Sequence, residues 1–452
     1  MAKHKQTSKA NIGRSGGPSQ IRAEDTTELP SSDTIPLKLQ QQLLDVFERA
    51  CNVRPGPELD LSLQEVKGHL YNRDFASAFG KAEYLDAYAA RWSPSRALAY
   101  LQILQDISPI IVQSAAQSRP TDPGLPNGYT VSSATDAALV DQQPEDPSQA
   151  SFDAEGYSFV DISVPTAAGN LPPAYDASDQ APAYENPPAY PANATTFSDT
   201  ADRNGSALSI ACFGGGAGAE LVACAGWLRH QADQQIEEDE SVVGEAPVDL
   251  ESLRVHCVDI ADWSVVLDKL DSAITTPPTL SKYASAAAKA ANTPMLPAGA
   301  MQVEFCRQDL LEANVDALRS IVKGADVVTL MFTLNELYTT SVSKTQRLLF
   351  EMTVASRPGT LLLVVDSPGS YSSVTINGAE KKYPMQWLLD HTLLEASQNT
   401  RVLPRGKHWE KVLTDESKWF RLSKELKYPI DLENMRYQIH LYQRQQVYEQ
   451  AG

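Results

Sequence analysis

Cysteine is scarce in this chain, and long apolar runs are missing from it. Of 452 residues only 5 are cysteine, and no two of them have the Cys-x-x-Cys spacing of zinc sites or redox motifs. We therefore expect neither structural zinc nor disulfides, but small buried thiols in a reducing compartment. No apolar run approaches the roughly 20 residues of a transmembrane helix, and no cleavable signal begins the chain. These absences predict a soluble, intracellular protein.

Positive charge is missing from the segment between Thr121 and Thr200, which contains no lysine or arginine. Acidic residues recur throughout this segment, and most of the excess negative charge behind the formal net charge of -19 lies there. Such a balance excludes a nucleic-acid binder along the whole chain. The segment is also rich in proline, alanine, serine and tyrosine, so we expect residues 114–203 to be a disordered linker.

Two proline motifs lie within this acidic linker. The segments from Pro172 to Tyr175 and from Pro187 to Tyr190 both read Pro-Pro-Ala-Tyr. WW domains bind such PPxY motifs in an extended polyproline conformation, so a WW-domain protein is a possible partner. Chance recurrence in a segment of biased composition is the alternative, because the pattern is only four residues long.

Composition divides the remaining chain into a tail and two folded parts. Residues 1–35 predict a disordered basic tail. In residues 36–113, apolar and aromatic residues recur at three- and four-residue spacing, which predicts three or four helices. Residues 204–447 alternate strand-like and helix-like segments, with insertions near 232–250 and 275–299. We expect the helical region to pack against this last domain, although its aromatic residues could instead stack on RNA bases.

The alternation of strands and helices predicts an α/β fold with a mostly parallel, doubly wound sheet and helices on both faces. Helices connect parallel strands in this way because each strand must return to the same edge before the next begins. The predicted strands are Ala207 to Phe213, Leu253 to Ile260, Met301 to Cys306, Asp326 to Phe332, Thr360 to Asp366 and Tyr437 to Gln443.

The first predicted strand runs into a glycine-rich turn. Gly214, Gly216 and Gly218 follow this strand and precede a helix-like apolar repeat that begins at Leu221. Glycines let the backbone adopt positive φ and approach a ligand closely, and the free amides of a following helix favour polar groups. A nucleotide-like cofactor is therefore expected at this turn.

Polar residues follow the next three strands, at the edge where a doubly wound sheet binds its ligand. Asp259 is placed to accept hydrogen bonds from two ribose hydroxyls, and Asp309 from an adenine amino group; either acid could instead cap a helix. The fourth strand is followed by Asn335, Glu336 and Tyr338. These side chains could line the bottom of a reaction site, or they could only cap the next helix. These features alone do not choose between a dinucleotide and S-adenosylmethionine.

The order of these features resembles that of the class I S-adenosylmethionine-dependent methyltransferases. More narrowly, Phe332 to Tyr338, Gly359 to Tyr371 and Met435 to Tyr442 are similar to the fungal 25S rRNA (uridine-N3)-methyltransferases. The resemblance covers about Leu37 to Ile110 and Ala207 to Arg444. It implies a Rossmann-like sheet of seven strands, S-adenosylmethionine as cofactor, large-subunit rRNA or a pre-ribosome as partner, and a nuclear or nucleolar location.

The resemblance also implies roles for individual residues. Glu336 would be the base that removes the uridine N3 proton, with Asn335 orienting the uracil carbonyls and Tyr338 stacking or donating a hydrogen bond. Cys212 stands where many members carry an acid, so backbone carbonyls, water or Glu220 would contact the methionine amine instead. The implied cofactor-binding residues are Cys212, Gly214, Gly216, Gly218, Asp259, Ile260, Asp309, Leu310 and Thr333.

Basic and aromatic residues interleave late in the chain, a pattern that suits phosphate binding and base stacking. Arg405, Lys407, Trp409 and Lys411 are the predicted RNA contacts. The alternative is a solvated helix face over core aromatic residues, because acidic residues dilute the positive charge.

Three other functions stay open at this point. The enzyme could methylate a protein or a small molecule, since base recognition leaves no visible signature. The chain could instead be a cofactor-binding adaptor that recruits WW-domain proteins through its two Pro-Pro-Ala-Tyr motifs. An NAD-dependent dehydrogenase ranks below both, because no acid for hydride transfer stands out.

Overall fold

The computed structural model describes residues 35–118, 207–239, 250, 252–369, 371–376, 379–395, 397 and 403–447. The predicted basic tail lies outside these residues as far as residue 34, whereas Ile35 is already buried in the core. Most of the acidic linker and both Pro-Pro-Ala-Tyr motifs also lie outside, so the WW-domain partner stays a prediction. Among the helices in the described ranges, none has the length and apolar character needed to cross a membrane.

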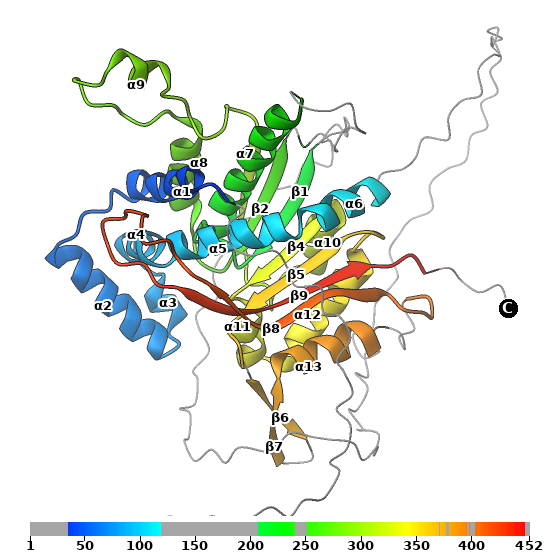
Figure 1. The fold of residues 1–452 in the computed structure, drawn as a ribbon. Helices are drawn as coiled ribbons and strands as arrows, with labels where there is room; N and C mark the ends of the chain where they lie inside the picture. Colours follow the sequence, from blue (N-terminus) through cyan, green and yellow to red (C-terminus); the bar gives the residue numbers. More distant parts are fainter. Residues whose placement is uncertain are drawn as a thin grey trace, which may run out of the picture.

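Seven strands form one sheet in the order β3-β2-β1-β4-β5-β9-β8 (Figure 1). The strands from β3 to β5 are parallel, and β9 and β8 are antiparallel to their neighbours. This order confirms the predicted doubly wound, mostly parallel α/β fold. The strands are β1 (Leu208–Phe213), β2 (Leu253–Asp259), β3 (Met301–Arg307), β4 (Val327–Met331), β5 (Leu361–Asp366), β8 (Trp409–Phe420) and β9 (Met435–Arg444).

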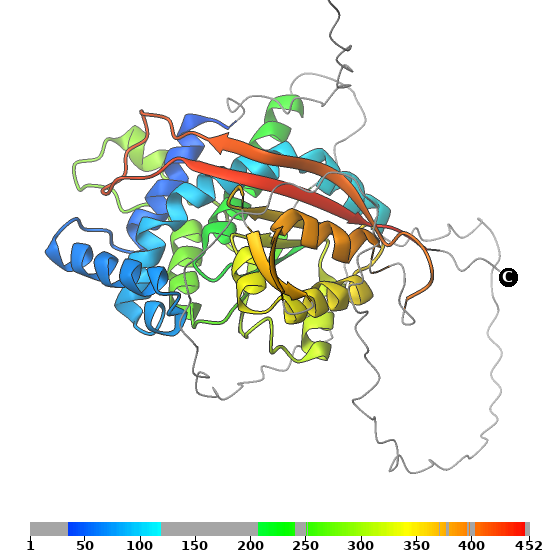
Figure 2. The same ribbon diagram turned by 90° about the horizontal axis from the view of Figure 1, so that it is seen from below.

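β8 is a strand that the sequence pattern does not reveal. Its charged residues alternate poorly with apolar ones, and its pairing with β9 shifts register between Lys411 and Leu413 and between Asp415 and Lys418. Such irregularities break the period of two by which a half-buried strand is recognised. β8 is the edge of the sheet, where exposed charge discourages pairing with another chain. Figure 2 shows β8 and β9 running side by side as a long hairpin.

Helices cover both faces of the sheet, because successive strand residues point to opposite sides. Ile210 and Cys212 of β1 belong to one core cluster, and Ala211 and Phe213 to the other. The first cluster lies under α1 (Leu37–Ala50), α5 (Ser93–Asp106), α7 (Ala219–Asp239) and α8 (Ser264–Thr275). The second lies under α10 (Val315–Gly324), α11 (Leu334–Thr340), α12 (Val342–Ala355) and α13 (Met385–Asp390).

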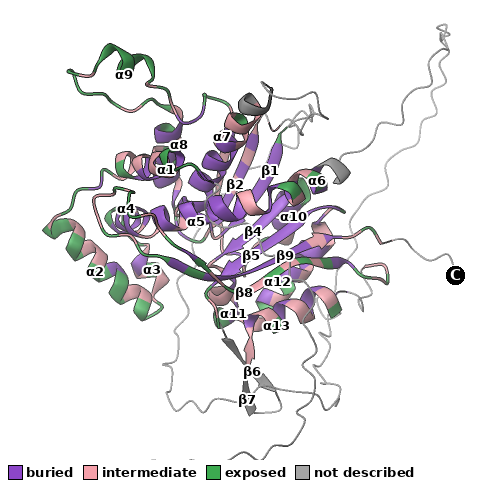
Figure 3. Ribbon diagram, viewed as in Figure 1, coloured by how far each residue is buried: buried purple, intermediate pink, exposed green. Residues whose placement is uncertain are grey.

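The remaining elements lie at the periphery of the sheet. In Figure 3 the inner strands are buried, whereas α2 and α9 are largely exposed. The hairpin of β6 and β7 projects at the bottom of Figure 1, beyond α11 and α13. These elements are α2 (Pro57–Tyr71), α3 (Phe75–Ala78), α4 (Ala82–Arg91), α6 (Ser108–Ser118), α9 (Ala286–Ala290), β6 (Tyr371–Ile376), β7 (Ala379–Pro384) and the π-helical turn η1 (His391–Glu395).

Two segment boundaries differ from the sequence-based prediction. Helix α6 ends at Ser118, beyond the predicted end of the helical region at residue 113. Helix α7 continues to Asp239, through the first residues of the insertion predicted near 232–250. The exposed α9 lies in the second predicted insertion, near 275–299. Boundaries are hard to predict where polar residues continue a helix on its solvent side.

The N-terminal helices share their core with the sheet domain. A Cβ atom added at Gly226 of α7 would lie 2.9 Å from Leu43 of α1 and 3.2 Å from Leu101 of α5. Three helices therefore meet where α7 has no side chain. Lys418 of β8 also pairs with Asp106 at the end of α5, with 2.7 Å between their charged atoms. The helices and the sheet thus form one packed unit.

Replacing Gly226 by valine should destabilise the whole protein, because two extra methyl groups have no space between α1 and α5. We expect a loss of about 1–3 kcal/mol in the free energy of unfolding, measured by chemical denaturation. Gly68→Ala is the matched control, since a Cβ there meets nothing within 4 Å. A helix-interior alanine should leave stability unchanged or raise it by about 0.5–1 kcal/mol. Equal effects of the two changes would contradict this packing.

Candidate functional site

The glycine loop lies between β1 and α7, at the carboxyl end of the parallel strands. Gly214 and Gly218 have φ angles of 82° and 80°, a left-handed conformation that favours glycine. A Cβ atom at Gly214 would lie 2.2 Å from Oγ1 of Thr333, and one at Gly216 would lie 2.0 Å from the indole of Trp263. The loop is thus in close contact with the segments that follow β4 and β2.

Asp259 ends β2 beside this loop. Its Oδ2 accepts a hydrogen bond from the backbone N–H of Gly216 at 3.1 Å, and its Oδ1 accepts one from Ala261 at 3.2 Å. Burial raises the pKa of the Asp259 carboxyl, and these two backbone hydrogen bonds oppose the rise. Each carboxylate oxygen keeps a second lone pair, so the group can still accept from two ribose hydroxyls.

Three more of the predicted cofactor-binding residues lie at the ends of β2 and β3. Ile260 follows Asp259 and is 51% exposed, which leaves an apolar surface available for a flat ring. Leu310 is buried, and Asp309 accepts a hydrogen bond from the N–H of Leu311 at 2.9 Å. Asp309 therefore stabilises its own turn, although its second oxygen remains able to accept from an amino group.

Cys212 is a core residue of β1, two positions before Gly214. A small cavity lies between β1, α7 and α5, lined by residues that include Cys212, Glu220 and Tyr100. Cys212 is fully buried; Cys257 is its neighbour on β2, and Cys224 of α7 lines the same small cavity. The position that carries an acid in many class I methyltransferases is therefore occupied here by a core thiol.

The segment after β4 is held by a carboxylate that is not among the predicted site residues. Asp366, at the end of β5, accepts hydrogen bonds from the N–H of Asn335 at 3.0 Å and of Ser367 at 2.7 Å. Burial raises the pKa of Asp366 to about 6. An acid at the carboxyl end of a buried strand is the signal that could have identified it.

Glu336 forms an ion pair with a residue of the N-terminal helices. Its carboxylate lies 3.0 Å from the guanidinium of Arg73, and both side chains are partly exposed. Arg73 lies between α2 and α3 and has a φ angle of 55°, in the left-handed region that few arginines adopt. The N-terminal helices therefore reach the rim of the site beside α11.

The structure does not place Tyr338 in the site. Its side chain is 1% exposed and packs in the second core cluster, under α12 and α13. A tyrosine buried in this way cannot stack on a nucleobase. Position 338 lies one helical turn after Leu334, which is also buried, so it belongs to the core-facing stripe of α11.

The predicted RNA contacts also need correction. Trp409 is 1% exposed, and its indole N–H donates to Oγ1 of Thr353 at 2.9 Å, so it is a core residue. Lys411 pairs with Asp390 at 2.8 Å. Arg405 and Lys407 are exposed. Trp409 pairs with the end of β9, which itself pairs with the start of β5, so this group lies at the amino edge of the sheet, opposite the glycine loop.

Aromatic residues of the N-terminal helices cover the glycine loop. Trp263, which contacts Gly216, has its ring centroid 5.3 Å from that of Phe79 and 5.7 Å from that of Tyr88. Tyr88 accepts a hydrogen bond from Arg96 of α5 at 2.8 Å. The same guanidinium lies 5.1 Å from the ring of Phe332, the residue before Thr333. The sequence did not predict that these aromatic residues contact Trp263, because aromatic residues at helical spacing usually belong to the core.

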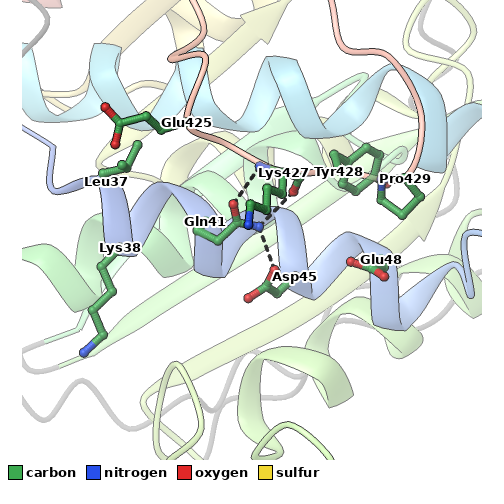
Figure 4. Close-up of a pocket in the computed structure, with 9 residues that line it drawn as sticks. All are labelled: Leu37, Lys38, Gln41, Asp45, Glu48, Glu425, Lys427, Tyr428 and Pro429. Carbon is green, nitrogen blue, oxygen red and sulfur yellow. Dashed lines mark hydrogen bonds between the residues drawn. The ribbon is translucent and has the colours of Figure 1, made fainter.

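A surface pocket lies at some distance from these groups, between α1 and the loop that joins β8 to β9 (Figure 4). The side chain of Gln41 exchanges two hydrogen bonds with the backbone of Lys427 there, each of 2.9 Å. Glycine-loop and strand-end residues are not part of its lining. We interpret the pocket as the junction that fixes this loop to α1.

The family comparison decides which cofactor the site serves. Residues 46–443 match the model of a family described as "putative SAM-dependent methyltransferase". The chain belongs to this family. S-Adenosylmethionine is therefore the methyl donor of this methyltransferase.

The chain is also similar to individual proteins. The chain is 26% identical over 425 residues to the 25S rRNA (uridine(2843)-N(3))-methyltransferase of Saccharomyces cerevisiae, covering 94% of this chain and 88% of that protein. Among solved structures, it is similar to a SAM-dependent methyltransferase of Methanosarcina mazei, with 9% identity and a TM-score of 0.29. The match covers 52% of this chain and 92% of that protein. It is also similar to the antibiotic-resistance methyltransferase Kmr, with 11% identity and a TM-score of 0.28; the match covers 54% of this chain and 91% of Kmr. The fold assignment rests on the strand order and the family match.

The residues of this methyltransferase fit its cofactor. The glycine loop, Asp259, Asp309 and Thr333 lie along the carboxyl edge of β1 to β4, where the strand order reverses. Oε1 of Glu220, beside the loop, has no hydrogen-bond partner among the described residues. A buried acceptor of this kind suits a ligand that carries a hydrogen-bond donor.

A buried histidine supports the turn after Asp366. Gln438 of β9 donates to the carbonyl of Ser367 at 2.8 Å, and its side-chain oxygen lies 3.1 Å from Nε2 of His440. Nδ1 of His440 lies 2.8 Å from Oγ1 of Thr414. Burial, together with the charge of Lys411, lowers the pKa of His440 from 6.5 to about 4.

This depressed pKa predicts an acid-sensitive fold. His440 stays neutral in the folded protein, whereas the unfolded chain binds a proton below pH 6.5. Its stabilising contribution is therefore complete above pH 6.5 and is lost as the pH falls towards 4, by about 3 kcal/mol. His440→Gln should flatten the pH dependence of the free energy of unfolding across this window. If the free energy of unfolding changes with pH in the same way for the wild type and for His440→Gln, His440 does not titrate in this window.

Proposed function

We propose that this methyltransferase transfers a methyl group to N3 of a uridine in large-subunit rRNA. The observation that carries the proposal is the similarity to the yeast 25S rRNA uridine-N3 methyltransferase over 94% of this chain. The similarity extends through the N-terminal helices as well as the sheet domain, so it involves more than the cofactor site. Such a substrate would place the protein in the nucleus or nucleolus.

The chemistry of uridine N3 defines what the site must do. S-Adenosylmethionine supplies an electrophilic methyl group, so the protein mainly has to align the nucleophile with it. N3 has no free lone pair while it carries its proton. A bond from N3 to the methyl carbon therefore forms as the N3–H bond breaks, and a base must accept that proton.

Asn335 and Glu336 are the proposed substrate-facing residues. The side-chain amide of Asn335 would donate to a uracil carbonyl, and the carboxylate of Glu336 would accept the N3 proton. Asp366 fixes the start of α11 through the backbone N–H of Asn335, so it acts as a positioning residue. Arg73, which pairs with Glu336, would have to give way to the uracil ring.

Removing the proposed base should reduce methylation strongly. Glu336→Gln keeps the shape of the side chain but cannot accept a proton, so we expect about 10²- to 10⁴-fold slower turnover. Asn335→Ala should also slow turnover, whereas Glu312→Gln, an exposed acid that pairs with Lys344, should have no effect. Mass spectrometry of rRNA nucleosides from cells lacking the protein, complemented by each variant, measures 3-methyluridine. Full turnover by both site variants with cofactor bound would refute the assignment.

RNA would approach the carboxyl edge of the sheet, where the site lies. Trp419 near the end of β8 is 49% exposed and pairs across the hairpin with Arg436. Gln438, two residues after Arg436, pairs with Asp366 at the end of β5. The Trp419–Arg436 pair therefore extends past the end of β5, on the face that also carries α11.

This end of β8 carries positive charge without acidic partners. The guanidinium carbons of Arg421 and Arg436 lie 5.0 Å and 5.8 Å from the ring of Trp419. Neither arginine forms an ion pair with the described residues, and Arg436 donates only to Ser417. Two guanidinium groups beside an exposed indole can bind phosphates and stack on an unpaired base. We define Trp419, Arg421 and Arg436 as the arginine–tryptophan patch.

The loop that follows this patch is attached to the N-terminal helices. Gln41 of α1 binds the backbone of Lys427, as Figure 4 shows. The hydroxyl of Tyr428 donates to the carbonyl of Ala90 at 2.9 Å, and Arg91 pairs with Glu433. These contacts hold the patch in place beside the site, which lowers the cost of ordering it when RNA binds.

Charge reversal should distinguish the two ends of β8. Arg421→Glu with Arg436→Glu should weaken binding of a labelled, uridine-containing single-stranded RNA and reduce the salt dependence of the affinity by about two phosphate contacts. Arg405→Glu with Lys407→Glu makes the same change in charge at the amino edge and should have much less effect. Fluorescence anisotropy across a series of salt concentrations measures both. A larger loss for the second pair would place the RNA at the amino edge instead.

A further inference from the structure

Two groups of opposite charge lie beside the glycine loop, and the described residues give neither an oppositely charged partner within 4.0 Å. Arg96 belongs to α5 and is partly buried; its guanidinium donates to the hydroxyl of Tyr88. Glu220 belongs to the first turn of α7 and is 5% exposed. Unpaired charges away from water are costly, so such groups point to a charged ligand.

Arg96 lies over the end of β4. Its guanidinium carbon is 5.1 Å from the ring of Phe332, which has a φ angle of 58° at the turn between β4 and α11. Tyr100, one turn further along α5, lies 6.5 Å from the same ring. Ser93 donates to the carbonyl of Ala217 in the glycine loop at 2.7 Å. The first turns of α5 therefore lie against both the loop and the end of β4.

Glu220 lies beside the same loop, at the start of α7. Its carboxyl carbon would be 3.4 Å from a Cβ atom built on Gly215, and its Oε1 has no hydrogen-bond partner among the described residues. Tyr100 lines the small cavity that Glu220 also lines, so α5 reaches this carboxyl too. Burial raises the pKa of Glu220 well above its usual value, and the nearby charge of Arg96 offsets only part of this rise.

We propose that Arg96 and Glu220 together bind the amino-acid end of S-adenosylmethionine, Arg96 through its carboxylate and Glu220 through its ammonium group. A guanidinium can bind a carboxylate through two parallel hydrogen bonds, and a carboxylate accepts strongly from an ammonium group. Glu220 thereby replaces the acid that Cys212 does not supply. The inference rests on the cofactor of the proposed function, and not on which nucleotide is methylated.

The N-terminal helices are then part of the cofactor site and not an appendage of the enzyme. α5 supplies Arg96. Phe79, directly after α3, and Tyr88 of α4 pack on Trp263 over the glycine loop. The sheet domain alone would keep the adenosine contacts but lack the carboxylate partner. Cofactor recognition is thus divided between two parts of the chain that a long linker separates.

The test combines ligands that lack the carboxylate or the whole amino-acid end with protein variants that lack the charge of Arg96 or Glu220. Calorimetry measures binding of S-adenosylhomocysteine, of its decarboxylated analogue and of 5′-methylthioadenosine, which lacks the whole amino-acid end. Arg96→Gln should weaken binding of S-adenosylhomocysteine by about 10- to 100-fold, and binding of the other two ligands should be unchanged. Glu220→Gln should weaken the first two ligands and spare 5′-methylthioadenosine. Arg96→Lys, which keeps the charge, should retain most of the preference for S-adenosylhomocysteine.

For each variant, the ratios of the affinities for the three ligands distinguish a change in recognition from a change in folding. An unfolded fraction of the protein lowers the apparent binding of all three ligands equally. Arg91→Gln is the matched control, since this neighbouring arginine pairs with Glu433 and should leave the ratios unchanged. If Arg96→Gln weakens all three ligands equally, or none, the proposal is wrong while the cofactor assignment stands. If the wild-type protein binds none of them, the cofactor assignment fails and this proposal fails with it.

Discussion

The close contacts of the glycine loop are the constraint on which the rest of the site depends. The space that a side chain at Gly214 would need is occupied by Thr333, and the space beside Gly216 is occupied by the indole of Trp263. A side chain at either position would push β4 or α8 away from the loop, because neither contact has space to spare. The ends of β1, β2 and β4 are therefore fixed relative to one another before any ligand binds, which is the preorganisation that group transfer requires.

The same contacts explain why the N-terminal helices belong to the catalytic unit. Trp263 packs against Phe79 at the end of α3 and Tyr88 of α4, so these helices hold the indole that contacts Gly216. Arg73 extends this cover to Glu336 on the other side of the site. The sheet domain thus gains a second wall for the candidate site from helices that precede it in sequence.

Sequence reasoning succeeded where one residue type determines the local structure. Glycine spacing after a buried strand locates the loop, and acids at strand ends locate Asp259 and Asp309, because parallel strands bring their carboxyl ends to one edge. It failed where tertiary context decides. Trp409 and Trp419 are both tryptophans within one charged stretch, yet one is core and the other exposed, and the two register shifts in β8 make their faces impossible to count from sequence. Arg96 sits among aromatic residues whose helical spacing predicts only packing.

The shared core of helices and sheet also bears on how the chain is made. Arg91 and Glu433 are separated by 342 positions, and Asp106 and Lys418 by 312, yet both pairs are in contact. Contacts of such high sequence separation form late, because a long loop must close first. During synthesis the apolar faces of α1 and α5 emerge from the ribosome well before α7, β8 and β9 exist to cover them. The nascent helices must therefore keep apolar surface uncovered until the last strand has been translated, and uncovered apolar surface of this kind favours aggregation during folding.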